Sequence, residues 1–135
     1  MGKQEHGGGC LCGGVQYRAT GAMHSVITCH CGQCRRMTGH YGAFAACPRE
    51  EMNLVSTGTL AWYESSPGIR RGFCSRCGSS LFWNDEHRKE IYILAGTLDS
   101  PTGLRLVDHC YVADKGDYYE IGDGLPQHAQ WPPNT

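Results

Sequence analysis

The feature that most constrains this 135-residue sequence is the placement of its nine cysteines. Seven of them fall into three groups: the pair Cys10 and Cys12, the triplet Cys29, Cys31 and Cys34, and the pair Cys74 and Cys77. Cysteines so close in sequence are poor partners for structural disulfides and good metal ligands. We therefore expect a fold organised around bound metal in a reducing compartment.

The two pairs together supply four thiolates, the ligand set of a closed, tetrahedral structural zinc site. Each pair is followed by a glycine, Gly13 or Gly78, which lets the backbone turn tightly so that its amides face sulfur. Such a site would join the N-terminal strand to the middle of the fold. The alternatives are two unrelated pairs or a C-x-x-C redox pair, but the βαβ context of a thioredoxin-like motif is missing.

The triplet offers only three ligands. Catalytic zinc sites keep three protein ligands and an open fourth position, whereas structural sites are closed. From spacing alone, the triplet is either such an open site or a site completed by a ligand from elsewhere. The candidates for that fourth ligand are Cys47, Cys110, His30, His40 and His109. His30 lies inside the triplet, where we expect its side chain to point away from the metal.

Residues beside the triplet are candidates for binding a substrate. Arg35 and Arg36 follow Cys34 directly and either neutralise the thiolate cluster or receive a substrate carboxylate. Gly39 and Gly42 bracket His40 and Tyr41, in a loop that would admit a ligand close to the backbone.

Charge and hydropathy exclude several classes of function. A formal net charge of -1 without a basic stripe argues against a nucleic-acid partner. No stretch approaches about 18 consecutive apolar residues, so we expect no membrane span. The N-terminal residues contain no apolar run typical of a secretory signal, and we expect a cytoplasmic protein. The sequence does not indicate an oligomeric state.

Short segments of alternating apolar and polar residues, separated by glycines, predict strands and a mostly β fold. In residues 14–19, Val15, Tyr17 and Ala19 would share one face. The other predicted strands lie within residues 24–28, 41–47, 59–65, 70–74, 79–84, 90–96 and 104–112. Pro48 and the following acidic residues predict one helical turn, and residues 125–133 are expected to run extended over the surface. We expect antiparallel pairing in one domain, residues 1–135, with a core from about 9 to 131.

The order of the cysteine groups resembles that of a known family. The segments "GGCLCGGVQY", "CHCGQCRRMTG", "FCSRCGSSLF" and "ILAGTLD" are similar to motifs of the glutathione-dependent formaldehyde-activating enzymes, a family that also includes centromere protein V. The resemblance implies a fold of the β-tent type with two zinc ions per chain. It implies a structural zinc on the two cysteine pairs and a catalytic zinc on Cys29, Cys31 and Cys34.

The resemblance also implies an activity. In this family a thiol such as glutathione condenses with formaldehyde to S-(hydroxymethyl)glutathione, and the reverse reaction is a carbon–sulfur lysis. A protonated side chain near the metal would stabilise the alkoxide that forms, and His30, His40 and His109 are the candidates. The alternative is a zinc-stabilised binding module without catalysis, which a filled fourth position at the triplet would favour.

Overall fold

The computed structural model describes residues 5–23 and 25–131, which form two compact units. The first unit contains the described residues up to 23 together with Ala45–Gly103. The second contains Ser25–Phe44 and the chain from Leu104 onward. The prediction that residues 1–135 form a single domain stays a prediction, and residues 1–4 and 132–135 lie outside the described part.

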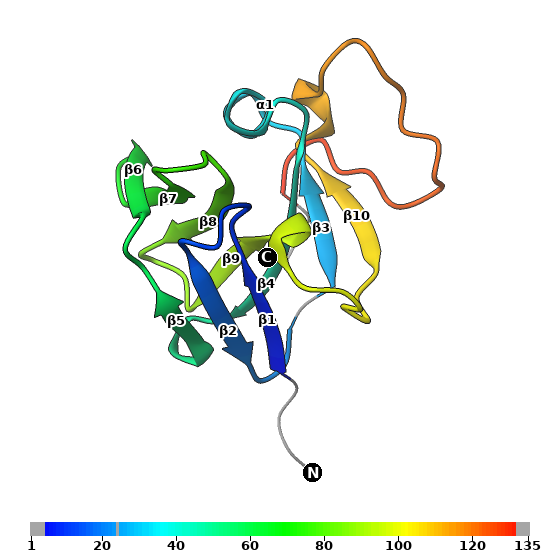
Figure 1. Ribbon diagram of the computed structural model, residues 1–135. Coiled ribbons are helices and arrows are strands. Elements are labelled where there is room, and N and C mark those ends of the chain that lie inside the picture. The colour runs from blue at the N-terminus through cyan, green and yellow to red at the C-terminus, as the bar shows by residue number, and fades with distance from the viewer. Residues whose placement is uncertain (1–4, 24, 132–135) are drawn as a thin grey trace. The chain divides into compact units, whose positions relative to one another are not determined.

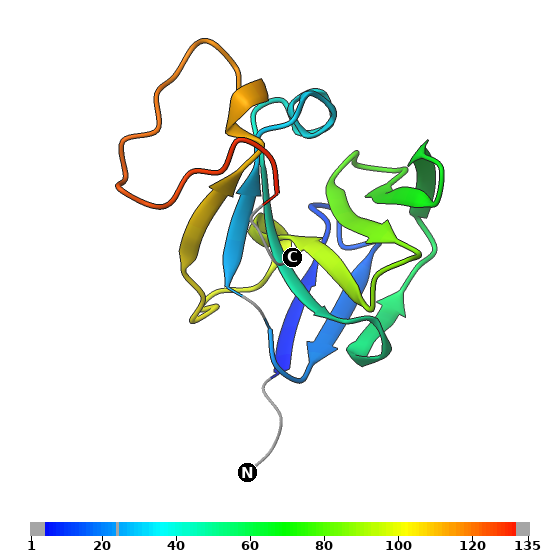
Figure 2. The same ribbon diagram turned by 180° about the vertical axis from the view of Figure 1, so that it is seen from behind.

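The first unit contains two groups of antiparallel strands (Figures 1 and 2). One group has the order β1-β2-β5, with β1 at Glu5–Gly9, β2 at Gln16–Thr20 and β5 at Met52–Ser56. The other has the order β9-β8-β7-β6. Its strands are β6 (Leu60–Ser66), β7 (Ile69–Cys74), β8 (Ser80–Asp85) and β9 (Glu90–Leu94). The order follows from the short turns between successive strands, which favour antiparallel neighbours.

Aromatic and aliphatic side chains form the core of the first unit. Tyr17 packs edge-on against Phe82 with ring centroids 5.3 Å apart, and Trp62 stacks on Phe82 at 5.9 Å. Leu81 and Ile93 are fully buried. The alternation predicted for residues 14–19 is confirmed, because Val15, Tyr17 and Ala19 are buried whereas the intervening polar residues are exposed.

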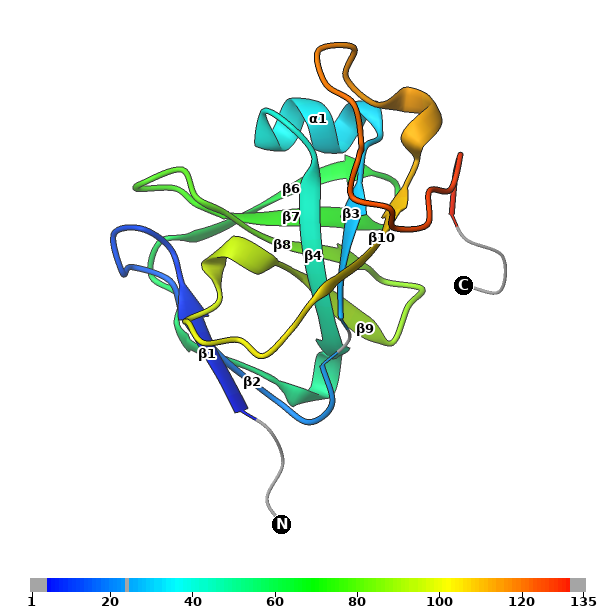
Figure 3. The same cartoon turned by 90° about the vertical axis from the view of Figure 1, so that its right-hand side faces the viewer.

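Three strands form the sheet of the second unit, in the order β10-β3-β4 (Figure 3). They are β3 (Val26–Cys29), β4 (Gly42–Pro48) and β10 (Leu106–Cys110), and β4 continues into the first unit. β4 pairs antiparallel with β3, as predicted, but β10 pairs parallel with β3. A parallel pair requires a long connection, which the residues between β3 and β10 provide.

The helix α1 (Gly32–Thr38) was not predicted. Cys31 caps its N-terminus, where its thiol accepts a hydrogen bond from the amide of Cys34, and Gly39 ends it in a left-handed conformation with φ +86°. A helix of 7 residues is too short for a 3.6-residue period to be visible in the sequence. The helical turn predicted after Pro48 is confirmed as the 3-10 helix η1 (Arg49–Glu51).

The mostly β fold is confirmed, and the remaining elements are short. Two more 3-10 helices, η2 (Ala95–Thr97) and η3 (Val112–Asp114), follow β9 and β10. The strands β1 and β5 were not predicted. Residues 126–130 lie beside β10 and the residues that follow it, and the amide of His109 donates to the carbonyl of Pro126 at 2.9 Å. Among the described residues no helix is long and apolar enough to cross a membrane.

Candidate metal centres and active site

The four paired cysteines come together in the first unit. Cys10, Cys12, Cys74 and Cys77 place their sulfur atoms within 4.8 Å of one another. The Cys10 and Cys12 sulfur atoms are 3.6 Å apart, and those of Cys12 and Cys74 are 3.7 Å apart. The expectation that the two pairs form one cluster therefore agrees with the structure, and the donor set fits a metal that prefers four thiolates.

The two glycines after the pairs have the predicted role. Gly13 and Gly78 have φ of +80° and +81°, a backbone region that other residues rarely adopt. These turns aim backbone amides at sulfur: Val15 donates to the Cys10 sulfur at 3.2 Å, and Cys77 donates to the Cys74 sulfur at 3.4 Å. Amides directed at sulfur stabilise the thiolate form that binds metal.

Two hydroxyl groups lie next to sulfur atoms of this four-cysteine cluster. The hydroxyl of Thr59 lies 3.2 Å from the Cys74 sulfur, and this contact, followed by the nearby amides, holds the pKa of Cys74 below its ordinary value. The hydroxyl of Ser79 contacts the Cys77 sulfur at 3.1 Å and is the main cause that lowers the pKa of Cys77 to about 5. Thiols that ionise this readily are suited to metal binding near neutral pH.

The triplet forms a second cluster, in the second unit. Cys29 ends β3, Cys31 caps α1 and Cys34 lies in the first turn of α1, and their sulfur atoms lie within 4.8 Å of one another. Hydrogen bonds from the thiols of Cys29 and Cys34 lower the pKa of Cys31 to about 2. The same interactions raise the pKa of Cys29. Hydrogen bonding among the three thiols thus favours the thiolate form of Cys31 and disfavours that of Cys29.

The candidates for a fourth ligand in the second unit have other partners. Cys110 lies opposite Cys29 in the parallel pair of β10 and β3, but its thiol lies 3.9 Å from the carboxylate of Asp108. His40 Nδ1 lies 2.6 Å from the hydroxyl of Tyr118. Within the described residues the triplet cluster contains three ligand atoms. Cys47 is buried in the first unit, and its role as a ligand stays a prediction.

His30 points away from the cysteines on either side of it, as expected. Its Nε2 lies 2.9 Å from the Thr28 hydroxyl and 3.0 Å from His109 Nδ1, and its Nδ1 contacts the hydroxyl of Tyr119. Burial lowers the pKa of His30 to about 4, and the charges of His109, His40 and Lys115 act in the same direction. His30 is therefore neutral near pH 7 and is unsuited to be a protonated acid there.

Two of the four predicted substrate residues, His40 and Tyr41, pack together and against His30. His40 and Tyr41 have ring centroids 4.4 Å apart, and Tyr41 lies 4.7 Å from the ring of His30. Arg36 is exposed. The Nε of Arg35 is buried and has no hydrogen-bond partner among the described residues. A buried guanidinium nitrogen without a partner is costly and suits the binding of an anion.

The sequence interpretation missed three residues near the triplet. Thr28, Tyr119 and Asp123 complete a set of hydrogen bonds with His30 and His109. Tyr119 and Asp123 lie in a region with few apolar residues, for which the sequence predicted no strand or helix. The adjacent tyrosines Tyr118 and Tyr119 in this polar region were the available signal, because paired aromatics usually pack against something.

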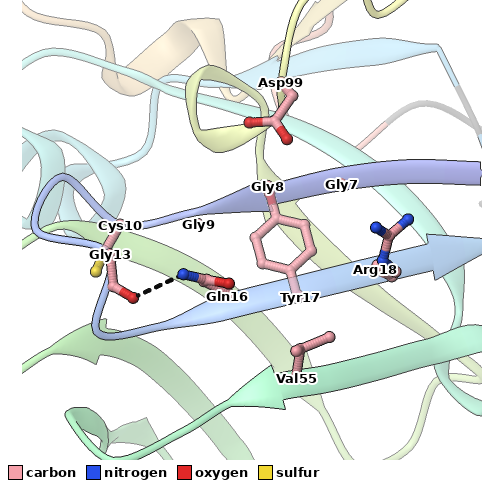
Figure 4. A pocket seen from close by; sticks show the side chains of 10 residues that line it. All are labelled: Gly7, Gly8, Gly9, Cys10, Gly13, Gln16, Tyr17, Arg18, Val55 and Asp99. Carbon is pink, nitrogen blue, oxygen red and sulfur yellow. Dashed lines mark hydrogen bonds between the residues drawn. The ribbon is translucent and has the colours of Figure 1, made fainter.

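A hollow of about 510 Å³ lies elsewhere in the first unit (Figure 4). The glycines of β1 line it, together with Arg18 and Asp99. Packing explains the glycine at position 8, since a Cβ there would overlap the Tyr17 ring. The hydroxyl of Tyr17 in turn bonds that of Thr97 at 2.7 Å. Packing against Tyr17 therefore accounts for the glycine at position 8.

Comparisons with known proteins identify the family and several relatives of this chain. The sequence profile of the glutathione-dependent formaldehyde-activating enzymes matches residues 5–114, and the chain belongs to this family. A relative from Halomonas elongata, assigned by name to the same enzymes, is 31% identical over 126 residues, covering 84% of this chain and 79% of its own length. An uncharacterized lyase of Schizosaccharomyces pombe is 24% identical over 121 residues, covering 88% of this chain and 87% of its own.

The fold also has a counterpart among crystal structures. A protein from Rhodobacter sphaeroides matches with a TM-score of 0.53 and 20% sequence identity. The match covers 75% of this chain and 99% of that protein. At this identity the likeness shows the fold alone.

Proposed function

We propose that this protein is a zinc-dependent carbon–sulfur lyase of the glutathione-dependent formaldehyde-activating type. Its substrate would be a thiol adduct such as S-(hydroxymethyl)glutathione, which it forms from, or cleaves to, the thiol and formaldehyde. The observation that carries the proposal is the triplet cluster, whose three thiols have no fourth ligand among the described residues. Three protein ligands with an open position are the pattern of catalytic zinc.

The two clusters would have different tasks. Cys10, Cys12, Cys74 and Cys77 would hold a structural zinc, and Cys29, Cys31 and Cys34 a catalytic one. A zinc ion at the triplet would supply a Lewis acid that lowers the pKa of a substrate thiol and orients its sulfur. All nine cysteines are free thiols, which supports a reducing, cytoplasmic location.

Side chains of the second unit would bind the rest of the substrate. Arg35 and Arg36 would receive a carboxylate of a thiol such as glutathione, and the unpartnered Nε of Arg35 supports this role. His40 and Tyr41 would form a wall of the site. Holding both reactants in place converts a bimolecular addition into an effectively intramolecular one.

A binding module without catalysis is the alternative, and it would need a filled fourth position at the triplet. In the second unit His30, His40, His109 and Cys110 all contact other groups, which argues against it. The direct test is exchange NMR with ¹³C-formaldehyde and glutathione. We expect the zinc-loaded protein to speed interconversion of the free thiol and the hydroxymethyl adduct. Cys31→Ser should abolish the acceleration, and an unaccelerated exchange with the wild type would refute the proposal.

A further inference from the structure

A continuous chain of side-chain hydrogen bonds runs through the second unit from Tyr119 to Asp123. The Tyr119 hydroxyl contacts His30 Nδ1, and His30 Nε2 lies 2.9 Å from the Thr28 hydroxyl. That hydroxyl lies 2.6 Å from His109 Nδ1, and His109 Nε2 lies 2.7 Å from the Asp123 carboxylate. Thr28, His30 and His109 are 0%, 1% and 3% exposed, whereas the Asp123 side chain is 40% exposed. The chain therefore connects a half-buried hydroxyl with the surface.

The hydrogen bond between His109 and Asp123, the last one in the chain, fixes which group donates in each of the others. An ionised carboxylate only accepts, so His109 Nε2 donates to Asp123. With neutral rings, His109 Nδ1 is then an acceptor and takes the proton of the Thr28 hydroxyl. The facing nitrogens of His30 and His109 are 3.0 Å apart, so only one of them carries a hydrogen.

Because His109 Nδ1 is an acceptor, the donors and acceptors in the remaining hydrogen bonds are determined as well. His30 Nε2 carries the hydrogen and donates to Thr28, which leaves His30 Nδ1 as an acceptor. The Tyr119 hydroxyl therefore donates to His30. All the bonds point toward Asp123, and the remaining lone pairs of the Tyr119 oxygen are free to accept a proton from outside the chain.

Tyr119 packs against two of the proposed substrate residues, with its ring centroid 4.6 Å from that of His40 and 6.2 Å from that of Tyr41. Its hydroxyl contacts His30, which lies between Cys29 and Cys31 in sequence. The charge of Arg35, which follows Cys34, acts on the same hydroxyl. Figures 1 and 3 show η3, which precedes the Tyr119 segment, beside α1. Tyr119 thus lies beside His40 and Tyr41, which are proposed to line the substrate site.

We propose that Tyr119 exchanges a proton with the hydroxyl oxygen of the substrate and that His30, Thr28, His109 and Asp123 carry this proton to and from solvent. The inference rests on the proposed function and adds the proton route to it. It assigns Tyr119 as a catalytic residue and the other four as a relay.

In the lysis direction the C–S bond of the adduct breaks and its electron pair stays on sulfur, while the O–H electron pair forms the C=O bond of formaldehyde. The hydroxyl proton passes to the Tyr119 oxygen, and the Tyr119 proton passes to His30 Nδ1. One proton then moves from His30 to Thr28, from Thr28 to His109 and from His109 to Asp123, which releases it to water. Addition of the thiolate to formaldehyde uses the same steps in reverse.

The hydrogen-bond directions are tested in the substrate-free, metal-loaded protein. Nitrogen-15 NMR reports which ring nitrogen of each histidine carries the hydrogen. We expect His30 and His109 both to carry it on Nε2. A hydrogen on Nδ1 of His30 would overturn the inference, because Tyr119 would then accept from His30 instead of donating to it.

The relay is tested by exchange kinetics in variants that keep the wild-type metal content. Tyr119→Phe removes the first member of the chain and should lower kcat by about 100-fold, the scale of positioned proton transfer. Thr28→Val keeps the side-chain shape and leaves only the direct contact of His30 Nε2 with His109 Nδ1 at 3.0 Å, so its loss should be smaller, about tenfold. Thr28→Ser restores a hydroxyl and should recover most of the loss. Tyr63→Phe, which removes the hydroxyl of an exposed tyrosine in the first unit, should change kcat less than about twofold.

The outcomes separate the two proposals. An active wild type with unchanged rates in Thr28→Val and Tyr119→Phe would overturn the relay and leave the proposed function standing. A wild type that accelerates no exchange would refute the proposed function, and the relay with it. If Thr28→Val does not fold, Tyr119→Phe decides, because Tyr119 is only half-buried.

Discussion

The sulfur atoms of Cys12 and Cys74 lie 3.7 Å apart although 62 positions separate the two residues in sequence. A metal at this cluster would therefore join β1 and β2 to β7 and β8, so its binding energy would become folding energy. The triplet comes from neighbouring residues and closes no comparable loop. Structural zinc is worth roughly 10 kcal/mol or more in small domains.

Cys74→Ser should therefore leave an unfolded or insoluble protein, whereas Cys31→Ser should remain folded and lose one metal ion. Circular dichroism and metal analysis of both variants check this difference. If both variants unfolded, the assignment of a structural role to one cluster and a catalytic role to the other would be wrong.

Gly78→Ala should lower the free energy of unfolding by about 1–2 kcal/mol, because an alanine is strained in the left-handed region. Gly78 has φ +81° and an added Cβ would meet nothing within 4 Å, so the cost is purely conformational. Gly58 is equally open but lies outside that region, which makes Gly58→Ala the matched control. Urea unfolding should show little effect in the control, and equal losses in both variants would contradict the role of the backbone turn.

Acid should destabilise the protein partly through His30. In an unfolded chain histidine has a pKa of about 6.5. Burial lowers the pKa of His30 to about 4 in the folded protein. Between these values the unfolded chain binds more protons, so the contribution is fully present above about pH 6.5 and is lost as the pH falls toward 4. Below both pKa values, the free energy of unfolding is lower by about 3 kcal/mol because of His30.

Urea unfolding of the metal-loaded protein at a series of pH values measures this contribution. His30→Asn should have a shallower dependence on pH than the wild type. His87→Asn is the control, because the His87 side chain is 79% exposed. Comparing variants removes the effect of the thiolates, which titrate in all of them. Parallel curves for the wild type and His30→Asn would exclude His30 as the cause.

Cys47→Ala and Cys110→Ala should each retain both metal ions. Both thiols are buried, and burial is the main cause that raises the pKa of Cys47 to about 11 and that of Cys110 to about 12. Such thiols remain protonated near neutral pH and are poor ligands. Native mass spectrometry gives the metal count, and the loss of one metal from either variant would identify that cysteine as the fourth ligand of the triplet.

The two cysteine clusters were predictable because ligand spacing is local information. The pairs and the triplet could be recognised from sequence separations of two or three, and Gly13 and Gly78 from the turns that such pairs need. Strands such as β2 were predictable from the alternation that burial of Tyr17 and Ala19 imposes.

The chain of hydrogen bonds from Tyr119 to Asp123 was not predictable in the same way. Thr28 meets His109 across 81 positions, through a parallel pairing of β3 with β10 that no turn signals. The helix α1 is set by the thiol cap at Cys31 and by Gly39, not by an apolar period. Tyr119 and Asp123 lie in a segment whose contacts depend on tertiary structure alone.

Glutathione added to the cobalt-substituted protein tests most directly whether the triplet holds a metal that binds the sulfur of the substrate. Thiolate ligands give cobalt charge-transfer bands in the near ultraviolet. With cobalt at both clusters, millimolar glutathione should intensify these bands in the wild type and leave them unchanged in Cys31→Ser. Unchanged bands in the wild type would contradict a thiol substrate at this metal.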